Sequence, residues 1–262
     1  MINTTPVILL IGGRGSRMDN LNLANTPPKA LTTINSQPLI IHSMKNFLDY
    51  GYNNFIFALG YKGDKIKKYF EKKIIIKGRK INFIKNLNDF NKFNNHKSNH
   101  KDNHINILLL NTGKNSNKTQ RIYKIISCIE TTDFIVSYGD GVGDVNLNKM
   151  KNLHYKNKFL CTCASYIPKS QYGHFIYSEG NIINFVEKPK LVDKINIGYF
   201  FFRQEAAKFI KKYINIDLEA GVIKNFALKG KIQTYHHKGF WKSVDTLKDA
   251  NDLSRILKHD KK

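Results

Sequence analysis

Residues 7–29, VILLIGGRGSRMDNLNLANTPPK, form the stretch around which the rest of this chain is organised. The segment VILLI at 7–11 is a short unbroken apolar run, which favours a strand buried on both faces of a parallel sheet. Gly12, Gly13 and Gly15 follow directly, and glycines let backbone N–H groups approach an anion closely. The stretch therefore predicts a phosphate-binding loop at the end of a central strand.

Charged residues beside the glycines support this prediction. Arg14 and Arg17 lie in the loop, and Pro27-Pro28 stiffens the chain ahead of Lys29, as suits triphosphate binding. The spacing is not that of a P-loop, because no Gly-Lys-Ser/Thr follows, and the GxGxxG dinucleotide pattern is not met. The plain alternative is that glycines after a strand simply form a turn. Arg17 and Lys29 argue against that alternative.

Two segments of this stretch resemble a known family. GGRGSRM at 12–18 and PPKAL at 27–31 resemble the signature of the sugar-phosphate nucleotidyltransferases, Gly-Gly-x-Gly-Thr-Arg-Leu followed by Pro-Lys-Pro. The resemblance implies that Lys29 steadies charge around the reacting phosphate. It also implies that the loop holds a nucleoside triphosphate through Ile11, Gly12, Gly13, Gly15, Ser16 and Arg17. The departures here are Ser16 for threonine and Ala30 for the second proline.

Length and composition indicate a folded globular protein. The chain has 262 residues, of which 41% are hydrophobic and 12% aromatic, enough for one α/β domain with a substantial core. A net charge of +23 is compatible with a solvated basic surface, with attraction of polyanionic substrates or with nucleic-acid binding. The lysines are scattered, and the aromatic residues follow strand and helix periodicity instead of interleaving with a basic patch. We therefore expect a basic surface and no nucleic-acid partner.

Apolar runs and cysteines bear on the cellular compartment. No run of 18 apolar residues occurs, and the N-terminus enters a strand without a charged leader, so we expect a cytoplasmic protein with no membrane partner. Cys161 and Cys163 lie in a strand-like run, FLCTCASY, where alternate residues share a face. With Cys128 as the third cysteine, we expect buried free thiols rather than zinc ligands or a disulfide.

Helical and strand patterns alternate along the chain. Pro38 precedes a helical pattern that ends at Gly51, and a second predicted helix turns Ile66, Tyr69 and Phe70 inward. Strands are predicted at 54–59, 105–110 and 134–138, with a helix at 122–129. This alternation predicts a Rossmann-like open, mainly parallel mixed sheet of α/β class. We expect a single domain over 1–262, with a nucleotide-binding half at about 1–145 and an acceptor-binding half at about 146–262.

Residues 85–104 interrupt this alternation. They are poor in aliphatic side chains and rich in asparagine, lysine and histidine, which predicts a long surface loop. His96, His100 and His104 are four residues apart and would align on one helix face as metal ligands. We expect no physiological metal there, because no apolar stripe supports a helix.

Two aspartates are candidate metal ligands. Asp140 follows the predicted strand 134–138, at the edge where ligands bind in open α/β sheets, although Asp-Gly can also be a simple turn. YGDG at 138–141 resembles the metal-binding motif of the family. GFWKSVDTLKD at 239–249 resembles GFWxxMDTLxD of the family and carries Asp245, which could also cap the last helix. Mg²⁺ prefers oxygen ligands and keeps several waters, so two carboxylates and phosphate oxygens suffice.

Acceptor-binding residues are implied by the resemblance. Predicted strands at 159–167, 173–177, 181–186 and 195–202 would include an antiparallel addition to the sheet and form the acceptor half. Glu187-Lys188-Pro189 matches the family's sugar-phosphate lysine, although a lone Lys-Pro is a weak signal. The other implied acceptor residues are Tyr172, Gly173, Asn196, Gly198 and Glu219. Gln171 for arginine and Ile197 for glycine are departures that bear on which acceptor fits.

The resemblance covers residues 7–257 and looks closest to the glucose-1-phosphate cytidylyltransferase branch, in which GYKG and IKKYF also occur. It implies transfer of CMP from CTP to a sugar 1-phosphate in a homo-oligomer, with Mg²⁺ on Asp140 and Asp245. Lys29 and Arg17 would be the catalytic cations, and Ser116, Arg121 and Gly139 would join the nucleotide site. Asn117-Lys118-Thr119-Gln120-Arg121 replaces Met-Thr-Gly-Gly-Arg of the family.

Three alternatives remain open to the sequence. One is a nucleotidyltransferase acting on a different phosphorylated acceptor, and another is a homologue that binds nucleotide without catalysis. The third is a basic nucleic-acid-binding domain. Retention of Lys29, Asp140, Lys188 and Asp245 argues against the last two.

Overall fold

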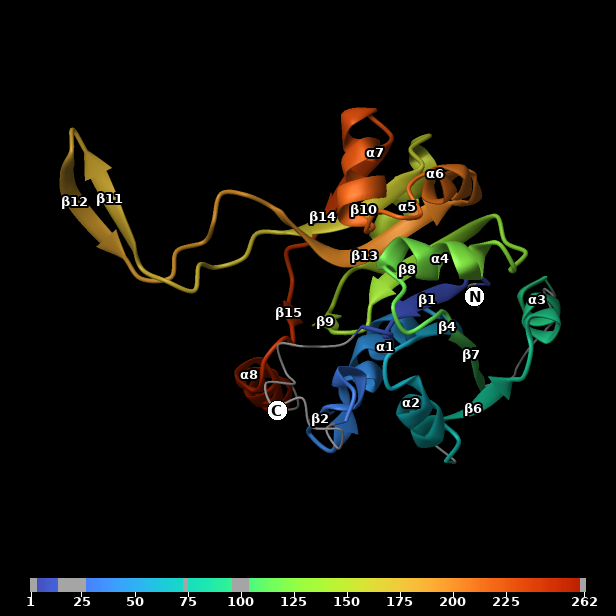
Figure 1. Ribbon diagram of the computed structural model, residues 1–262. Helices are drawn as coiled ribbons and strands as arrows, with labels where there is room; N and C mark the ends of the chain where they lie inside the picture. The colour runs from blue at the N-terminus through green and yellow to red at the C-terminus, as the bar shows by residue number, and fades with distance from the viewer. Residues whose placement is uncertain (1–3, 14–26, 73–74, 96–103, 260–262) are drawn as a thin grey trace.

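The computed structural model describes residues 4–13, 27–72, 75–95 and 104–259. Within these ranges, nine strands form one central sheet in the order β14, β10, β13, β8, β1, β4, β7, β6, β5 (Figure 1). Their bounds are β1 (Val7–Leu10), β4 (Asn54–Leu59), β5 (Ile75–Ile76), β6 (Arg79–Ile84), β7 (His104–Asn111), β8 (Asp133–Tyr138), β10 (Cys161–Tyr166), β13 (Ile195–Arg203) and β14 (Ile232–His236).

The direction of the strands confirms the predicted sheet. β13 is antiparallel to both β8 and β10, and β5 is antiparallel to β6, whereas the other neighbouring pairs are parallel. A mainly parallel mixed sheet is therefore present. β1 lies between β4 and β8, so the glycine loop that follows it emerges at the middle of the sheet.

Both faces of the sheet are buried, as the continuous apolar run of β1 predicts. Val7 and Leu9 pack into one core and Ile8 into the other, because successive strand residues point to opposite faces. The first core is covered by α1 (Leu39–Asp49), α2 (Gly63–Phe70) and α5 (Leu147–Lys156). The second is covered by α3 (Leu87–Asn95), α4 (Lys118–Ile126), α6 (Ala207–Lys212) and α7 (Lys224–Leu228).

A small third core attaches the last helix, α8 (Leu247–His259), through contacts among Ile34, Val142, Val244 and Leu253. Two short antiparallel pairs flank it: β2 (Thr33–Ile34) with β3 (Gln37–Pro38), and β9 (Gly141–Gly143) with β15 (Trp241–Ser243). Gly141 pairs with Ser243. This pairing brings the residues just before β9 close to those just after β15.

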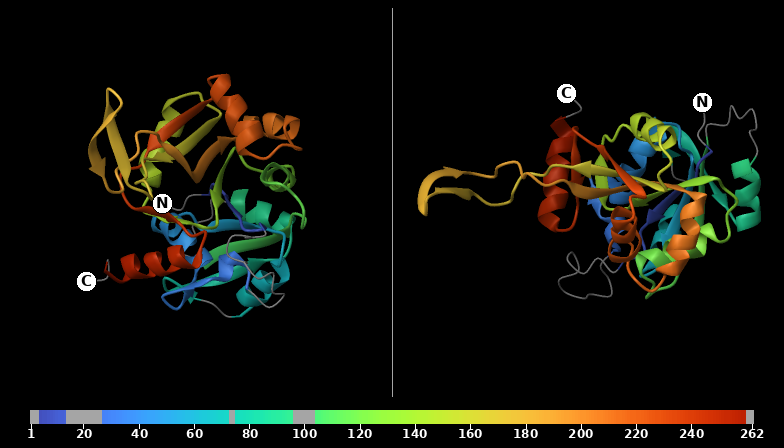
Figure 2. Two further views of the ribbon diagram at one scale, coloured as in Figure 1. Left: turned by 60° about the vertical axis from the view of Figure 1, so that its left-hand side comes forward. Right: turned by 90° about the horizontal axis from the view of Figure 1, so that it is seen from above.

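One pair of strands leaves the body of the molecule. β11 (His174–Ser178) and β12 (Asn181–Val186) pair with one another in a separate two-stranded sheet, which projects outward on two extended segments (Figures 1 and 2). We call residues 168–191 the arm. The strands are inserted between β10 and β13, as the predicted insertion requires. The predicted antiparallel addition to the main sheet is β13, which pairs with β10 and β8, whereas the ladder hydrogen bonds of β11 and β12 join only these two strands of the described chain.

Two local predictions are corrected. Residues 87–95 form α3 instead of continuing a loop, since Phe90 is buried in the second core and Asn86 accepts a hydrogen bond from the Asp89 amide. Leu87 also packs against this core, so apolar contacts and a cap support the helix. α4 begins at Lys118 instead of residue 122, because Asn117 and Gln120 form a capping box. His96 and His100 lie outside the described residues, and His104 begins β7.

The cysteines are free, as predicted, with Cys161 and Cys163 buried and Cys128 exposed. Both buried thiols lie in the second core, and burial raises the pKa of Cys163 to about 12. They therefore remain protonated and unreactive at neutral pH. In the portion of the chain with a described structure, none of the helices combines the length and apolarity that crossing a lipid bilayer demands.

Candidate active site

Asp140 lies at the carboxyl end of β8, where the buried strand meets the open edge of the sheet. The preceding Gly139 allows this placement, because a Cβ there would lie 2.2 Å from Cγ2 of Ile11. The Gly139 carbonyl accepts a hydrogen bond of 3.2 Å from the Ser43 hydroxyl on α1. Close packing of the loops after β1 and β8 thus fixes the direction in which Asp140 points.

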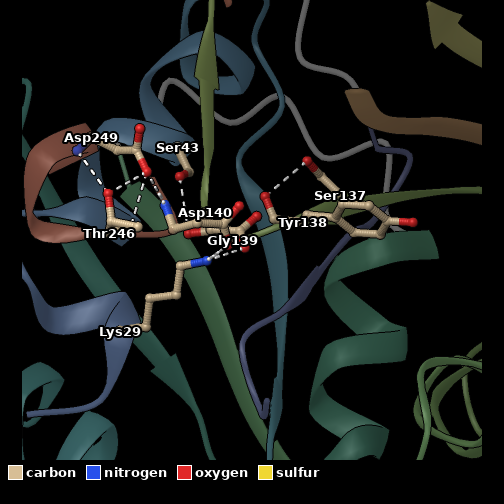
Figure 3. A network of polar contacts seen from close by, with 9 residues as sticks. Lys29, Ser43, Ser137, Tyr138, Gly139, Asp140, Thr246 and Asp249 are labelled. Atoms are coloured by element: carbon tan, nitrogen blue, oxygen red, sulfur yellow. Dashed lines mark hydrogen bonds and ion pairs between the residues drawn. The ribbon is translucent and has the colours of Figure 1, made fainter. Parts of the chain in front are cut away.

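Lys29 connects this aspartate to the second one. It begins a single 3₁₀ turn, Lys29–Leu31, after Pro28, whose φ of −60° and ψ of 146° are extended. Its Nζ lies 2.6 Å from Oδ2 of Asp140 (Figure 3) and 2.7 Å from Oδ1 of Asp245. The Lys29 side chain is only 15% exposed. Three predicted catalytic residues, from distant parts of the sequence, therefore form one cluster.

The residues after Asp245 form the helix cap. Thr246 Oγ1 accepts from the Asp249 amide at 3.1 Å, and Asp249 Oδ2 accepts from the Thr246 amide at 2.9 Å, which is a capping box at the start of α8 (Figure 3). The alternative that Asp245 itself caps α8 is therefore wrong. Because Thr246 takes that role, the Asp245 carboxylate is available to Lys29.

The Arg121 side chain supports the start of the glycine loop through hydrogen bonds. It is buried, and its Nη1 donates to the Leu59 carbonyl at 3.1 Å and to Thr112 Oγ1 at 2.8 Å, while Nη2 donates to the Gly12 carbonyl at 3.1 Å. A Cβ on either Gly12 or Gly60 would lie 2.3 Å from Nη1. Burial lowers the pKa of Arg121, but a guanidinium still remains charged at neutral pH. Arg121 therefore holds the ends of β1, β4 and β7 together.

A second polar cluster surrounds Lys118. Lys118 Nζ lies 2.6 Å from Oδ2 of Asp217 and 2.9 Å from Oε2 of Glu219. The Tyr138 hydroxyl donates to Oε1 of Glu219, and Asn196 Nδ2 lies 3.5 Å from that hydroxyl. Burial, followed by the charge of Glu219, raises the pKa of Tyr138, so the phenol remains a donor.

Both clusters contribute residues to the wall of one cavity of about 500 Å³, the first through the two aspartates that hold Lys29. Its walls include predicted nucleotide residues (Gly12, Gly13, Ser116, Arg121), the aspartates Asp140 and Asp245, and the predicted acceptor residues Asn196 and Glu219. Gly198 lies behind the wall, where its φ of +78° and the nearby Tyr138 ring favour glycine. A cavity of this size can hold a nucleotide-sized ligand.

Other predicted residues lie elsewhere. Tyr172, Gly173, Glu187 and Lys188 are on the arm and do not contribute to the cavity wall as far as the described residues define it. Lys188 Nζ lies 3.2 Å from Oε1 of Glu187, and both side chains are 60% exposed. The expectation that they line this chain's own site is not met in this conformation, because the arm projects away from the body. Gly15, Ser16 and Arg17 lie outside the described residues.

Several residues of the cavity wall are missing from the sequence prediction: Leu10, Asn117, Lys118, Tyr138, Gly141, Ile197, Asp217, Trp241 and Ser243. Tyr138 and Trp241 lie inside the YGDG and GFW motifs and could have been found there. Lys118 lies in the segment that departs from Met-Thr-Gly-Gly-Arg, whereas Asp217 carries no local signal and joins the site only through its contact with Lys118.

The aspartates fit a magnesium ion. Among the described residues, no group of three or more histidine, cysteine, aspartate or glutamate side chains is placed to hold a metal. Asp140 and Asp245 offer hard carboxylate oxygens from two separate elements, and they already share a cation, the Lys29 ammonium. Mg²⁺ is commonly bound by one or two carboxylates together with substrate phosphates. The donor set therefore suits a metal that arrives with a triphosphate.

Comparisons with known proteins bear on the family of the chain. A family model described as nucleotidyl transferase matches residues 6–258. A probable glucose-1-phosphate cytidylyltransferase of Bacillus subtilis (strain 168) is 29% identical over 249 residues, covering 95% of this chain and 94% of that protein. The glucose-1-phosphate cytidylyltransferase of Salmonella typhi is 27% identical over 250 residues, covering 92% and 91%.

A solved structure shares the fold. The inositol-1-phosphate CTP transferase from T. maritima aligns with a TM-score of 0.65 at 12% identity, covering 98% of this chain and 97% of that one. At this identity the match establishes the architecture of the sheet and its helices.

Proposed function

This chain belongs to the nucleotidyl transferase family, and on that premise we propose that it transfers CMP from CTP to a sugar 1-phosphate, with release of pyrophosphate. Glucose 1-phosphate is the first acceptor to test, because proteins named for that substrate are similar to this chain along most of its length. The observation that carries the proposal is the Lys29 ammonium held between Asp140 and Asp245 at the edge of the cavity.

The proposed reaction is a direct displacement. An oxygen of the acceptor's phosphate attacks the α-phosphorus of CTP, the bond from that phosphorus to the bridging oxygen breaks, and the electron pair leaves with pyrophosphate. Catalysis of this kind depends on positioning and on neutralising charge spread over phosphate oxygens. Lys29 supplies one cation, and we expect Arg17 to supply another. Mg²⁺ held by Asp140 and Asp245 would supply further neutralisation of the triphosphate.

The nucleotide side of the cavity is formed by the glycine loop and the start of α4. Gly12 and Gly13 line the cavity with open space beside Gly13, and the Ser116 hydroxyl donates to the Thr112 carbonyl at 2.7 Å beside Gly113. We propose that this small-residue wall receives the pyrimidine base. A buried partner left unpaired by the wrong base costs about 1–3 kcal/mol, so we expect CTP to be used in preference to ATP and GTP.

The acceptor side of the cavity includes Asn196 and Glu219, but the predicted sugar-phosphate lysine, Lys188, is on the arm. We propose that the chain forms a homo-oligomer in which the arm of one copy reaches a neighbouring copy. At the base of the arm, Ser170 N donates to the Pro189 carbonyl at 2.8 Å and Leu191 N donates to the Pro168 carbonyl at 2.9 Å. The arm is therefore a continuous ribbon with a defined direction.

The surface of the arm supports a protein partner. Two paired strands alone are marginally stable in water, and the arm exposes Tyr172, Phe175, Ile176, Tyr177, Ile182, Ile183 and Phe185. The arm carries three lysines and two glutamates, so it is nearly neutral on a chain of charge +23. A nearly neutral apolar ribbon can approach a second strongly basic copy without strong repulsion.

A pyrophosphate-release screen tests the reaction. CTP, UTP, dTTP, ATP and GTP are supplied at equal concentration, each with a panel of sugar 1-phosphates, and we expect the fastest turnover with CTP. Faster turnover with ATP or GTP would refute the cytidylyl assignment and leave the broader nucleotidyl transfer. Turnover restricted to another phosphorylated acceptor would correct the acceptor. Binding of CTP without pyrophosphate release would identify a non-catalytic homologue.

Mixing two impaired variants, assayed at an acceptor concentration well below the KM of Lys188→Ala, tests the arm. Lys188→Ala chains retain Asp140, and Asp140→Asn chains retain Lys188, so a mixed oligomer should recover activity if the lysine acts on a neighbouring copy. Recovery should be lost when Phe175→Ser and Phe185→Ser are added, whereas Ile75→Ser, an exposed apolar residue on β5, serves as the control. A wild-type chain that sediments as a monomer would contradict the arrangement.

A further inference from the structure

Three consecutive residues at the start of α4 are bound to the segment 214–219, which forms part of the opposite wall of the cavity. Asn117 Nδ2 donates to the Ile214 carbonyl at 3.1 Å, Thr119 Oγ1 donates to the Ile216 carbonyl at 2.6 Å, and the Lys118 amide donates to Oδ1 of Asp217 at 3.0 Å. The nucleotide side and the acceptor side of the cavity are thus tied together at this point.

The Lys118 side chain strengthens the connection with its charge. Its Nζ bridges Oδ2 of Asp217 and Oε2 of Glu219 and lies 5.7 Å from the centre of the Tyr138 ring. Burial acts to lower the pKa of Lys118, but its bonds to the two carboxylates outweigh burial and raise it. For Asp217, burial acts to raise the pKa, and the bonds to Lys118 outweigh it and lower it. The bridge is therefore ionic at neutral pH.

This bridge determines how Glu219 faces the cavity. Oε2 accepts from Lys118 and Oε1 accepts from Tyr138, so the carboxylate is held from both oxygens. Each carboxylate oxygen can accept about two hydrogen bonds, which leaves capacity for a donor from a ligand. Glu219 lines the cavity, so a ligand hydroxyl can reach it. Without the ammonium, the two carboxylates would lack this neighbouring positive charge and would repel a phosphorylated ligand.

We propose that Lys118 is a positioning residue that fixes Glu219 to accept a hydrogen bond from a hydroxyl of the phosphorylated acceptor, and so sets acceptor selectivity. The inference rests on the proposed function. It concerns this chain in particular, because the family sequence that Asn117-Lys118-Thr119-Gln120-Arg121 resembles has threonine in place of Lys118. An uncharged threonine cannot neutralise the two carboxylates.

Steady-state kinetics on Lys118→Met, Lys118→Arg and the wild type test the proposal. Lys118→Met should raise the KM for the acceptor about tenfold or more, because a charge-assisted hydrogen bond to Glu219 is lost, and should change the KM for CTP about twofold or less. Lys118→Arg should have a KM for the acceptor close to that of the wild type. Lys124→Met, an exposed lysine on the same helix, is the matched control and should match the wild type.

Monodeoxy analogues of the active sugar 1-phosphate sharpen the test. The wild type should use one analogue at least about tenfold less well in kcat/KM than the parent acceptor, because it lacks the hydroxyl that Glu219 binds. Lys118→Met should discriminate between these two substrates much less. If Lys118→Arg regains the discrimination that Lys118→Met loses, that loss cannot come from a general failure to fold.

The outcomes separate the inference from the proposed function. An active wild type with an unchanged acceptor KM in Lys118→Met would overturn the inference and leave the proposed function in place. An equal rise in the KM for CTP would assign Lys118 to the triphosphate and would also overturn it. A wild type without pyrophosphate release on any acceptor would overturn both. Thermal unfolding of Lys118→Met, Glu219→Gln and the double variant should show non-additive losses, and additive losses would show that the bridge does not form.

Discussion

Asp140 and Asp245 are separated by more than a hundred positions in the sequence, yet their carboxylates contact the same ammonium, that of Lys29, at 2.6 and 2.7 Å. The pairing of β9 with β15 brings them together, because one aspartate immediately precedes β9 and the other follows β15 by two residues. Two carboxylates on one cation form a site whose charge balance changes when another cation or an anionic ligand enters. Both aspartates are therefore sensitive points for activity.

Replacing either aspartate should abolish most activity without unfolding the chain. Asp140→Asn and Asp245→Asn keep the shape of the side chain and remove its charge, so we expect pyrophosphate release to fall at least about a hundredfold at nearly unchanged Tm. Asp252→Asn on α8 is the control and should remain active. Full activity in either site variant, or in excess EDTA, would remove the metal-binding assignment.

Lys188 and Arg17, whose roles are implied by the resemblance, should affect different substrates when they are replaced. Lys188→Ala should mainly raise the KM for the acceptor, whereas Arg17→Ala should mainly raise the KM for CTP, because the two cations are expected on opposite sides of the α-phosphate. Lys190→Ala, on the other side of Pro189, is the matched control for the arm. Equal defects towards both substrates would contradict this division.

Neighbouring glycines in the loop should respond differently to the same substitution. A Cβ on Gly12 would lie 2.3 Å from Nη1 of Arg121 and 2.8 Å from the Gly60 amide nitrogen, whereas a Cβ on Gly13 meets nothing within 4 Å. Gly12→Ala should lower the free energy of unfolding by about 1–3 kcal/mol, since the buried guanidinium must move. Gly13→Ala should unfold close to the wild-type temperature. Thermal unfolding measures both variants, and equal Tm values would show that the Arg121 side chain can move aside at little cost in stability.

His154 should make stability depend on pH. Burial, together with the positive charge of Arg203, lowers the pKa of this imidazole from 6.5 to about 4, and its Nδ1 lies 2.8 Å from Thr162 Oγ1. Between these values the unfolded chain binds a proton that the folded chain does not. Stability should therefore fall as the pH decreases from 6.5 to 4, by a total of about 3 kcal/mol from this group.

A non-titrating variant isolates this contribution. His154→Gln should be less stable than the wild type at pH 7 but should lose stability less steeply between pH 6.5 and 4. His174→Gln, on the exposed arm, should keep the wild-type slope. Urea unfolding at a series of pH values measures the slopes, and parallel curves for His154→Gln and the wild type would refute the assignment.

Much of the fold was accessible from local patterns. The apolar runs of β1, β4, β7 and β8 predict buried strands, because a parallel strand covered on both faces needs apolar residues at every position. The family resemblance in the glycine loop, YGDG and GFWKSVDTLKD is confirmed by the match over residues 6–258. Errors occurred where one tertiary contact outweighs composition, as when burial of Phe90 stabilises α3 within a polar segment.

The sequence by itself determined which chemistry the chain could offer: a glycine loop, a restrained lysine and aspartates next to strand ends. Only the tertiary structure decided which of these side chains meet. Lys29 joins Asp140 and Asp245 through the order of strands in the sheet, and Lys118 joins Glu219 because α4 packs beside the segment that carries it. The tertiary structure also decided that Lys188, on the arm, lies away from the cavity of its own chain. Such contacts depend on strand order and helix packing, which are set by the burial of the whole core and leave no trace in the residues near each side chain.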